Sequence, residues 1–165
     1  MNQQTDAVDR LIQQWNRERP ELNADLMGPA GRLKRCAALL QSPLEEVFKQ
    51  FGLNYWEFDV LATLRRSGAP YCLAPTQLFS SLMVSSGTMT HRLKGLEKRG
   101  LICRCNNPED ARSMLVQLSE EGFTLIDQAV TAHVENLDRL MSPFSEEEVE
   151  QLNQSLRRLL QTLER

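Results

Sequence analysis

Hydroxyl and basic residues are concentrated in one central stretch, SSGTMTHRLKGLEKRGL, which covers residues 85–101. At about 100° per residue, a helix here places Met89, Leu93 and Leu96 on one side and its polar side chains opposite. Hydroxyl groups and backbone N–H groups at a helix start donate hydrogen bonds to phosphates and base edges. The pattern therefore predicts a helix that reads double-stranded DNA through Ser85, Ser86, Thr88, Thr90, His91, Lys94 and Lys98.

Charge is distributed unevenly along the chain. The whole sequence carries a net −3, whereas residues 85–112 carry six cations against three anions, so the remainder carries −6. A local basic element on an acidic body is typical of a nucleic-acid contact. Taken alone, the same charge pattern is more often a solvated helix face. The DNA hypothesis therefore depends on the elements around the basic helix.

Residues for catalysis or metal binding are sparse. The chain has two histidines, His91 and His133, and lacks a G-x-S-x-G motif, a phosphate-binding glycine loop and a metal-spaced cluster. We therefore expect no enzyme activity, cofactor or metal. The four cysteines form no C-x-x-C pair, so reduced thiols are expected. Cys36 and Cys103 are the candidates for redox sensing, but Cys36 also fits a buried face, where thiols are usually inert.

Length and composition describe one ordinary domain, because 165 residues with 41% hydrophobic content suffice for a single core. The N-terminus MNQQTDAVDR lacks the basic and apolar regions of an export signal, and no stretch approaches the roughly 18 apolar residues of a membrane span. We expect a cytoplasmic protein without membrane contact.

The first half of the chain reads as successive helices. Apolar spacing predicts a helix over 8–15, and another begins at Pro29. Ser42 with Glu45 forms a possible capping box with Pro43 at the first helical position, which predicts a separate helix ending at Gly52. Further helices are expected from Asn54, with Glu57 as its capping partner, to Gly68, and within 75–84.

The second half adds two strands and two long helices. LICRC and MLVQLS flank the loop NNPEDARS, which predicts a hairpin. Ser119 can cap the next helix, whose apolar stripe includes Val134, and Ser145 with Glu148 starts a leucine-rich last helix.

The fold class is therefore mainly α with a small β wing: a winged helix-turn-helix flanked by N- and C-terminal helices. We assign 53–119 to a DNA-binding lobe and 1–52 with 120–165 to a helical dimerisation region.

The apolar stripes of the terminal helices need a cover that one small lobe cannot supply. Pairing two copies supplies it, and a two-fold homodimer presents two reading helices to half-sites about one DNA turn apart. The expected partners are therefore a second copy of the chain and a pseudo-palindromic DNA operator.

The stretch SSGTMTHRLKGLEKRGLICRCNNPEDARSMLVQLSEEG resembles the reading helix and wing of the MarR family of bacterial transcriptional regulators. The resemblance extends from about Leu33 to the C-terminus. It implies a homodimer, usually a repressor that a small ligand releases from DNA. It also implies that Arg112 at the wing tip enters the minor groove and that Asp110 orients it.

Arg92 is set apart because helical periodicity turns it toward the core side of the basic helix. The sequence resembles the urate-responsive branch of the family at Trp15, Asp59, Arg92 and Arg104. The resemblance implies that these residues bind urate or a related small anionic aromatic effector. An aromatic ring can stack on such an anion, guanidinium groups can pair with its oxygens, and a carboxylate can accept from a ring N–H.

Each of these four residues also has a structural explanation. Trp15 fits helix packing, and Asp59 fits a solvated charge or an ion pair with Arg104. Arg92 fits a phosphate contact, and Arg104 fits a role that only stiffens the wing. Three alternative functions remain open at this stage: a regulator of the same family that responds to phenolic or lipophilic acids, one that responds to thiol oxidation, and a winged-helix protein interaction module without DNA binding. Arg112, Lys94 and the hydroxyl cluster argue against the last.

Overall fold

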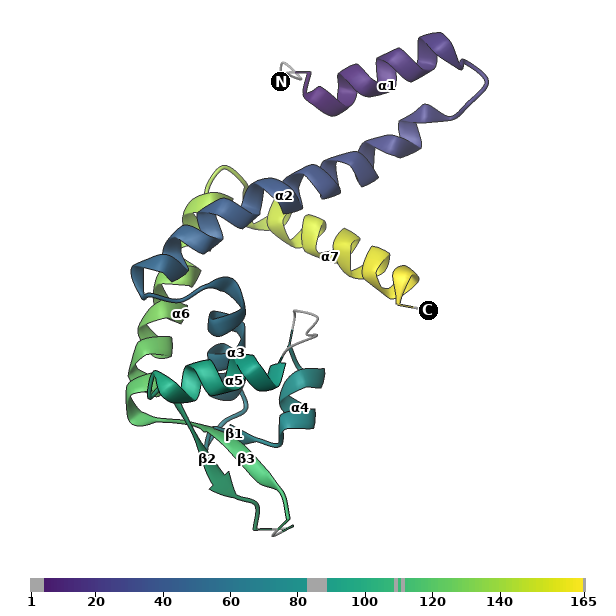
Figure 1. The fold of residues 1–165 in the computed structure, drawn as a ribbon. Helices are drawn as coiled ribbons and strands as arrows, with labels where there is room; N and C mark the ends of the chain where they lie inside the picture. Colours follow the sequence, from purple (N-terminus) through teal and green to yellow (C-terminus); the bar gives the residue numbers. More distant parts are fainter. Residues whose placement is uncertain (1–4, 83–88, 109, 111, 165) are drawn as a thin grey trace. The chain divides into compact units, whose positions relative to one another are not determined.

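The computed structural model describes residues 5–82, 89–108, 110 and 112–164 (Figure 1). The described part forms two compact units, residues 1–46 and 47–165. The helices are α1 (Ala7–Glu18), η1 (Ala24–Leu26), α2 (Met27–Gln50), α3 (Tyr55–Arg66), α4 (Pro75–Ser80), α5 (Met89–Lys98), α6 (Glu120–Met141) and α7 (Glu146–Leu163). The strands are β1 (Cys72–Leu73), β2 (Ile102–Asn106) and β3 (Met114–Leu118).

The first unit is a pairing of α1 with the start of α2. Asp6 caps α1, and its carboxylate together with that of Asp9 receives hydrogen bonds from Arg32 of α2 at 2.8 and 2.5 Å. The helices approach closely at Gly31, where an added Cβ would lie 3.1 Å from a methyl group of Val8. The buried Val8 packs there, so glycine on α2 permits the contact.

The predicted helix start at Ser42 is wrong, because α2 runs without a break through Pro43. The side chains of Gln41 and Ser42 donate to Glu45 and Glu46, one turn further along the same helix. A proline inside a helix costs about 3 kcal/mol. The 24-residue length of α2 shows that the remaining helix outweighs this cost. A serine–proline pair therefore does not mark a helix start by itself.

The winged elements of the second unit match the predicted order, with one addition. Asn54 and Glu57 form the predicted capping box of α3, and Gly68 follows the helix with a positive φ of 82°. The three-stranded antiparallel sheet has the order β1–β3–β2. The sequence did not reveal β1, because two residues are too few to carry an alternating pattern. Figure 1 shows α3, α4 and α5 grouped at one end of the sheet, from which β2 and β3 extend as a hairpin.

The core of the second unit lies between α3, α5, α6 and the sheet. Its fully buried side chains include Leu61, Leu64, Leu93, Leu96 and Val116. The N-terminus of α6 approaches Leu101 so closely that a Cβ at Gly122 would overlap the Leu101 carbonyl. Ser119 caps α6 as predicted. Val134 of the predicted apolar stripe is 57% exposed in the single chain, whereas Ile126 of the same stripe is buried, as is Ala129.

The last helix, α7, starts at the predicted capping box of Ser145 with Glu148. Its apolar side chains remain exposed in the single chain: Val149, Leu152, Leu156, Leu159, Leu160 and Leu163. In the described part of the chain, no helix has the length and apolar character needed to cross a membrane.

Candidate nucleic-acid interface and effector site

The basic helix α5 has the predicted division into a buried and an exposed side. Leu93 and Leu96 are buried in the core, whereas Thr90, His91, Lys94 and Lys98 are exposed. Ser85, Ser86 and Thr88 lie outside the described residues. The four described polar residues therefore form one surface with two lysines, an arrangement suited to phosphate and base contacts.

Two arginines at α5, Arg92 and Arg99, face α3. The exposed lysines of the helix lie on a different side. Arg92 and Arg99 are seven residues apart, which places them on the same side of a helix. The guanidinium carbon of Arg92 lies 5.2 Å from the ring centre of Trp56. Arg99 pairs with the Glu57 carboxylate at 2.7 Å and donates to the Gly52 carbonyl at 2.9 Å. Arg99 is therefore a structural contact between the α5 segment and α3.

The wing tip presents Arg112 on a turn that Asp110 stabilises. The Asp110 carboxylate accepts a hydrogen bond from the Arg112 backbone N–H at 3.0 Å. Ser113 donates its backbone N–H to the Asp110 carbonyl, and the Asn107 side chain donates to the Ser113 hydroxyl at 2.9 Å. The Arg112 side chain is exposed. Asp110 thus acts on the backbone of Arg112, and no described residue pairs with the Arg112 guanidinium.

Three of the four predicted effector residues belong to the second unit. Asp59 lies in α3 and is only 7% exposed. Arg104 pairs in register with Val116, so it shares the core-facing side of the sheet with that buried residue. Arg92 lies over Trp56, which precedes Asp59 by three residues on α3 and therefore shares a face with it. Two cations and a carboxylate thus lie on the inner sides of α5, β2 and α3.

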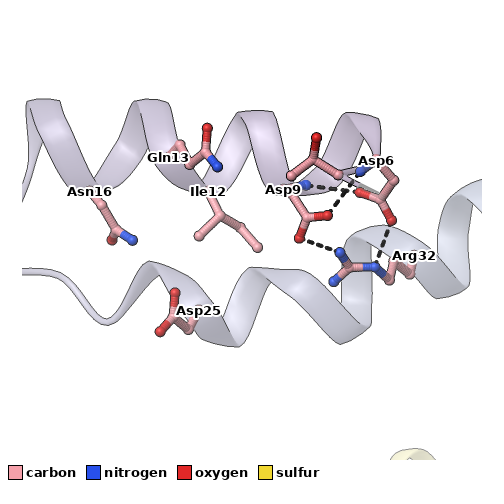
Figure 2. A pocket seen from close by; sticks show the side chains of 8 residues that line it. Asp6, Asp9, Ile12, Gln13, Asn16, Asp25 and Arg32 are labelled. Atoms are coloured by element: carbon pink, nitrogen blue, oxygen red, sulfur yellow. Dashed lines mark hydrogen bonds and ion pairs between the residues drawn. The ribbon is translucent and has the colours of Figure 1, made fainter. Parts of the chain in front are cut away.

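Trp15, the fourth predicted effector residue, belongs to the first unit and is 43% exposed. A groove of about 790 Å³ lies in this unit between α1, η1 and α2. Figure 2 shows Asp6, Asp9 and Arg32 joined by hydrogen bonds at one end of the groove, with Asp25 further along. Its lining residues include Ile12, Gln13 and Asn16 but none of the four predicted effector residues.

The cysteines are free thiols, as expected, but the expected burial of Cys36 is wrong. Cys36 and Cys103 are exposed. Cys103 lies on the outer face of the sheet, because its register partner is Gln117 and not a core residue. Burial raises the pKa of the Cys105 thiol, and the neighbouring Cys72 adds to this shift.

No described group of residues has the arrangement of a metal site.

His133 packs in an aromatic cluster. Its ring lies 5.3 Å from that of Phe48 and 5.2 Å from that of Phe58, measured between ring centres. Burial lowers the pKa of His133 below its ordinary value. The structure therefore packs this residue against α3 and the end of α2.

The residue that sequence reasoning missed is Trp56. The available signal was its spacing, since Trp56 and Asp59 are one helical turn apart in a predicted helix. The sequence interpretation gave Arg92 only an anionic ligand as its partner, with Trp15 stacking on that ligand. The observed aromatic partner comes from α3, within the same unit as Arg92.

The fold is a winged helix-turn-helix, a class of DNA-binding domain. It is defined by a three-helix group, a basic helix with an exposed polar side and a two-stranded hairpin. The family model described as "MarR family" matches residues 53–114. The HTH-type transcriptional regulator PecS from Dickeya dadantii (strain 3937) is 44% identical over 152 residues, which cover 92% of each chain. The chain therefore belongs to the MarR family, whose members are DNA-binding transcriptional regulators.

Solved structures agree with this assignment. A mutant of MarR from E. coli, complexed with operator DNA, has a TM-score of 0.69 and 26% identity, covering 84% of this chain and 99% of the other. Sco3205 from Streptomyces coelicolor, in complex with DNA, has a TM-score of 0.75 and 20% identity, covering 87% of this chain and 91% of the other. The second likeness supports the fold alone.

Proposed function

We propose that this chain forms a homodimer that represses transcription from a pseudo-palindromic operator and leaves DNA when a small anionic aromatic ligand binds. Urate or a related purine is the proposed ligand. The observation that carries the proposal is the orientation of Arg92, which belongs to the DNA-reading helix but faces α3. A ligand that captures this guanidinium acts directly on the position of the reading helix.

The proposed DNA contacts are divided between α5 and the wing. Thr90, His91, Lys94 and Lys98 lie on the exposed side of α5, and Arg112 is exposed at the wing tip. Ser85, Ser86 and Thr88 complete the proposed set at the start of the reading helix. The backbone hydrogen bond to Asp110 supports a fixed presentation of Arg112. Phosphate contacts of lysines position such a domain, and contacts to base edges supply its specificity.

The proposed ligand contacts are Asp59, Arg92 and Arg104, and Trp15 remains a prediction from the sequence. Two guanidinium groups and a mostly buried carboxylate suit a planar anion that also carries ring N–H groups. Simple phenolic acids offer oxygens to the arginines but no ring N–H to Asp59. This difference supports a purine over a phenolic acid.

The homodimer is proposed from the exposed apolar side chains of α7. Leu156, Leu160 and Leu163 recur along one side of the helix, and Leu163 is 72% exposed in the single chain. Isolated apolar stripes of this length are normally covered by another helix. We assign the dimerisation region to residues 1–52 and 120–165 and the DNA-binding lobe to residues 53–119. Leu156→Glu with Leu160→Glu should give a monomer in sedimentation velocity, while wild type sediments as a dimer.

The ligand proposal is tested by titrating urate into a complex of the protein with an operator selected from random DNA. Wild type should release the DNA, with a coupling of about 1–3 kcal/mol. Asp59→Asn and Arg104→Gln should retain DNA affinity and lose most of the response to urate. Asp25→Asn is the matched control in the first unit and should respond as wild type does. Release of all variants by urate alike would overturn the assigned site, and release by salicylate but not urate would replace the purine with a phenolic acid.

A further inference from the structure

The contact between Arg92 and Trp56 joins the reading helix to the helix that carries Asp59. The guanidinium carbon lies 5.2 Å from the centre of the indole ring, within the roughly 6 Å range of a cation–π interaction. Arg92 is half-buried, whereas its neighbours Thr90 and His91 are exposed. The indole therefore holds one guanidinium on the inner side of a helix whose other polar side chains face outward.

The N–H groups of Arg92 have no carboxylate partner within the described residues. The ion pairs of this part of the chain include Arg99 with Glu57 and Arg65 with Asp127 but none with Arg92. A guanidinium carries five N–H donors, and contact with an aromatic face does not use them. Among the described residues, Arg92 therefore has a defined position and no hydrogen-bond partner for its donors, the two properties that a preformed anion-binding group requires.

We propose that Trp56 is a positioning residue for ligand recognition: it holds Arg92 so that the guanidinium is ready to pair with a planar anion beside Asp59. This inference rests on the proposed function, because it concerns the same ligand site. Trp56 and Asp59 lie one turn apart on α3, so the aromatic contact and the carboxylate are carried on one helix face. Without the indole, Arg92 samples many rotamers, and ligand binding must then restrict them.

In the alternative arrangement, Trp56 and the ligand compete for the same guanidinium. The two arrangements predict opposite signs. If Trp56 positions Arg92, removal of the indole weakens ligand binding. If Trp56 competes, removal of the indole strengthens ligand binding. The free N–H groups of Arg92 favour the first arrangement, because a ligand can pair with them while the contact with Trp56 persists.

The test measures the dissociation constant of urate by calorimetry for full-length wild type, Trp56→Leu and Trp56→Phe. The energy of a cation–π interaction predicts about two- to five-fold weaker urate binding for Trp56→Leu. Trp56→Phe retains an aromatic face and should lose less. In an Arg92→Gln background, Trp56→Leu should cause no further loss. Unchanged or tighter binding by Trp56→Leu, or equal losses with and without Arg92, would overturn the positioning role.

A second measurement follows the contact without any ligand. The chain has two tryptophans, so Trp15→Phe leaves Trp56 as the single fluorophore. In that background, Arg92→Gln should shift the emission of Trp56, while Lys94→Gln on the opposite side of α5 should not. If Trp56 emits identically with and without Arg92→Gln, the contact is overturned. This measurement does not require Trp56→Leu to fold. Failure of wild type to bind urate would instead count against the proposed ligand, and the two failures are therefore distinguishable.

Discussion

The Arg99 guanidinium lies 2.7 Å from the Glu57 carboxylate, and this ion pair ties the end of the reading helix to the start of α3. Glu57 is mostly buried and also accepts the backbone N–H of Asn54 at 3.0 Å. One carboxylate thus closes the capping box of α3 and binds the cation that follows α5. The position of α5 depends on this pair as well as on its leucines.

Loss of the Arg99 side chain should destabilise the protein. Arg99→Leu leaves the Glu57 carboxylate without its cation, and a buried charged group that loses its partner costs about 1–3 kcal/mol. The change is measured as the free energy of unfolding in urea. Arg19→Leu breaks an exposed ion pair with Glu21 and serves as the control, with an expected change below about 1 kcal/mol. Equal effects of the two substitutions would contradict the role assigned to Arg99.

Two glycines should respond to alanine in opposite directions. Gly122→Ala places a Cβ against the Leu101 carbonyl and should destabilise the protein by about 1–3 kcal/mol or more. Gly95→Ala meets no atom within 4 Å inside α5 and should stabilise the protein by roughly 1 kcal/mol through helix propensity. The stabilities of the two variants and of wild type are compared by thermal unfolding without DNA. A stabilising Gly122→Ala would show that α6 does not approach Leu101 as described.

Stability should fall in mildly acidic solution because of His133. Burial lowers the pKa of His133 in the folded protein, while the unfolded chain has the ordinary value of about 6.5. Between these two pKa values the unfolded state binds more protons, so the free energy of unfolding rises with pH and levels off above about 6.5. His133→Phe should remove this contribution, and His91→Phe, at an exposed position, should retain it. A pH dependence unchanged by His133→Phe would refute the assignment.

Arg112 should contribute to DNA binding by charge. Arg112→Ala is expected to weaken operator binding and to reduce the slope of log affinity against log salt by about 1. Fluorescence anisotropy at several salt concentrations measures both quantities. Arg10→Ala, an exposed cation of the first unit, is the control and should leave the slope unchanged. Wild-type affinity in Arg112→Ala would contradict the wing assignment.

Local sequence signals predicted most of the second unit. The capping boxes at Asn54 and Ser145 were correct because their donors and acceptors are three residues apart and need no distant partner. The inward direction of Arg92 was also correct, since helical periodicity determines it. The same local reasoning failed at Pro43, because a capping pattern can also occur inside a long helix.

The remaining differences arise from contacts between distant parts of the chain. Trp56 and Arg92 are 36 residues apart, and neither periodicity nor charge shows that they meet. The partner of Arg99 lies 42 residues away in sequence, so one of the six cations counted in residues 85–112 has a structural contact instead. β1 exists only because β3 offers it a pairing edge.

The central claim is that ligand binding and DNA binding are coupled through the reading helix, and reciprocity tests it most directly. Thermodynamic linkage requires that urate weakens operator binding by the same factor by which the operator weakens urate binding. Both dissociation constants should be measured with and without the other partner, for wild type and Arg92→Gln. The account predicts equal factors of about 5- to 150-fold for wild type and factors near one for Arg92→Gln. Wild-type dissociation constants that do not depend on the other partner would contradict it.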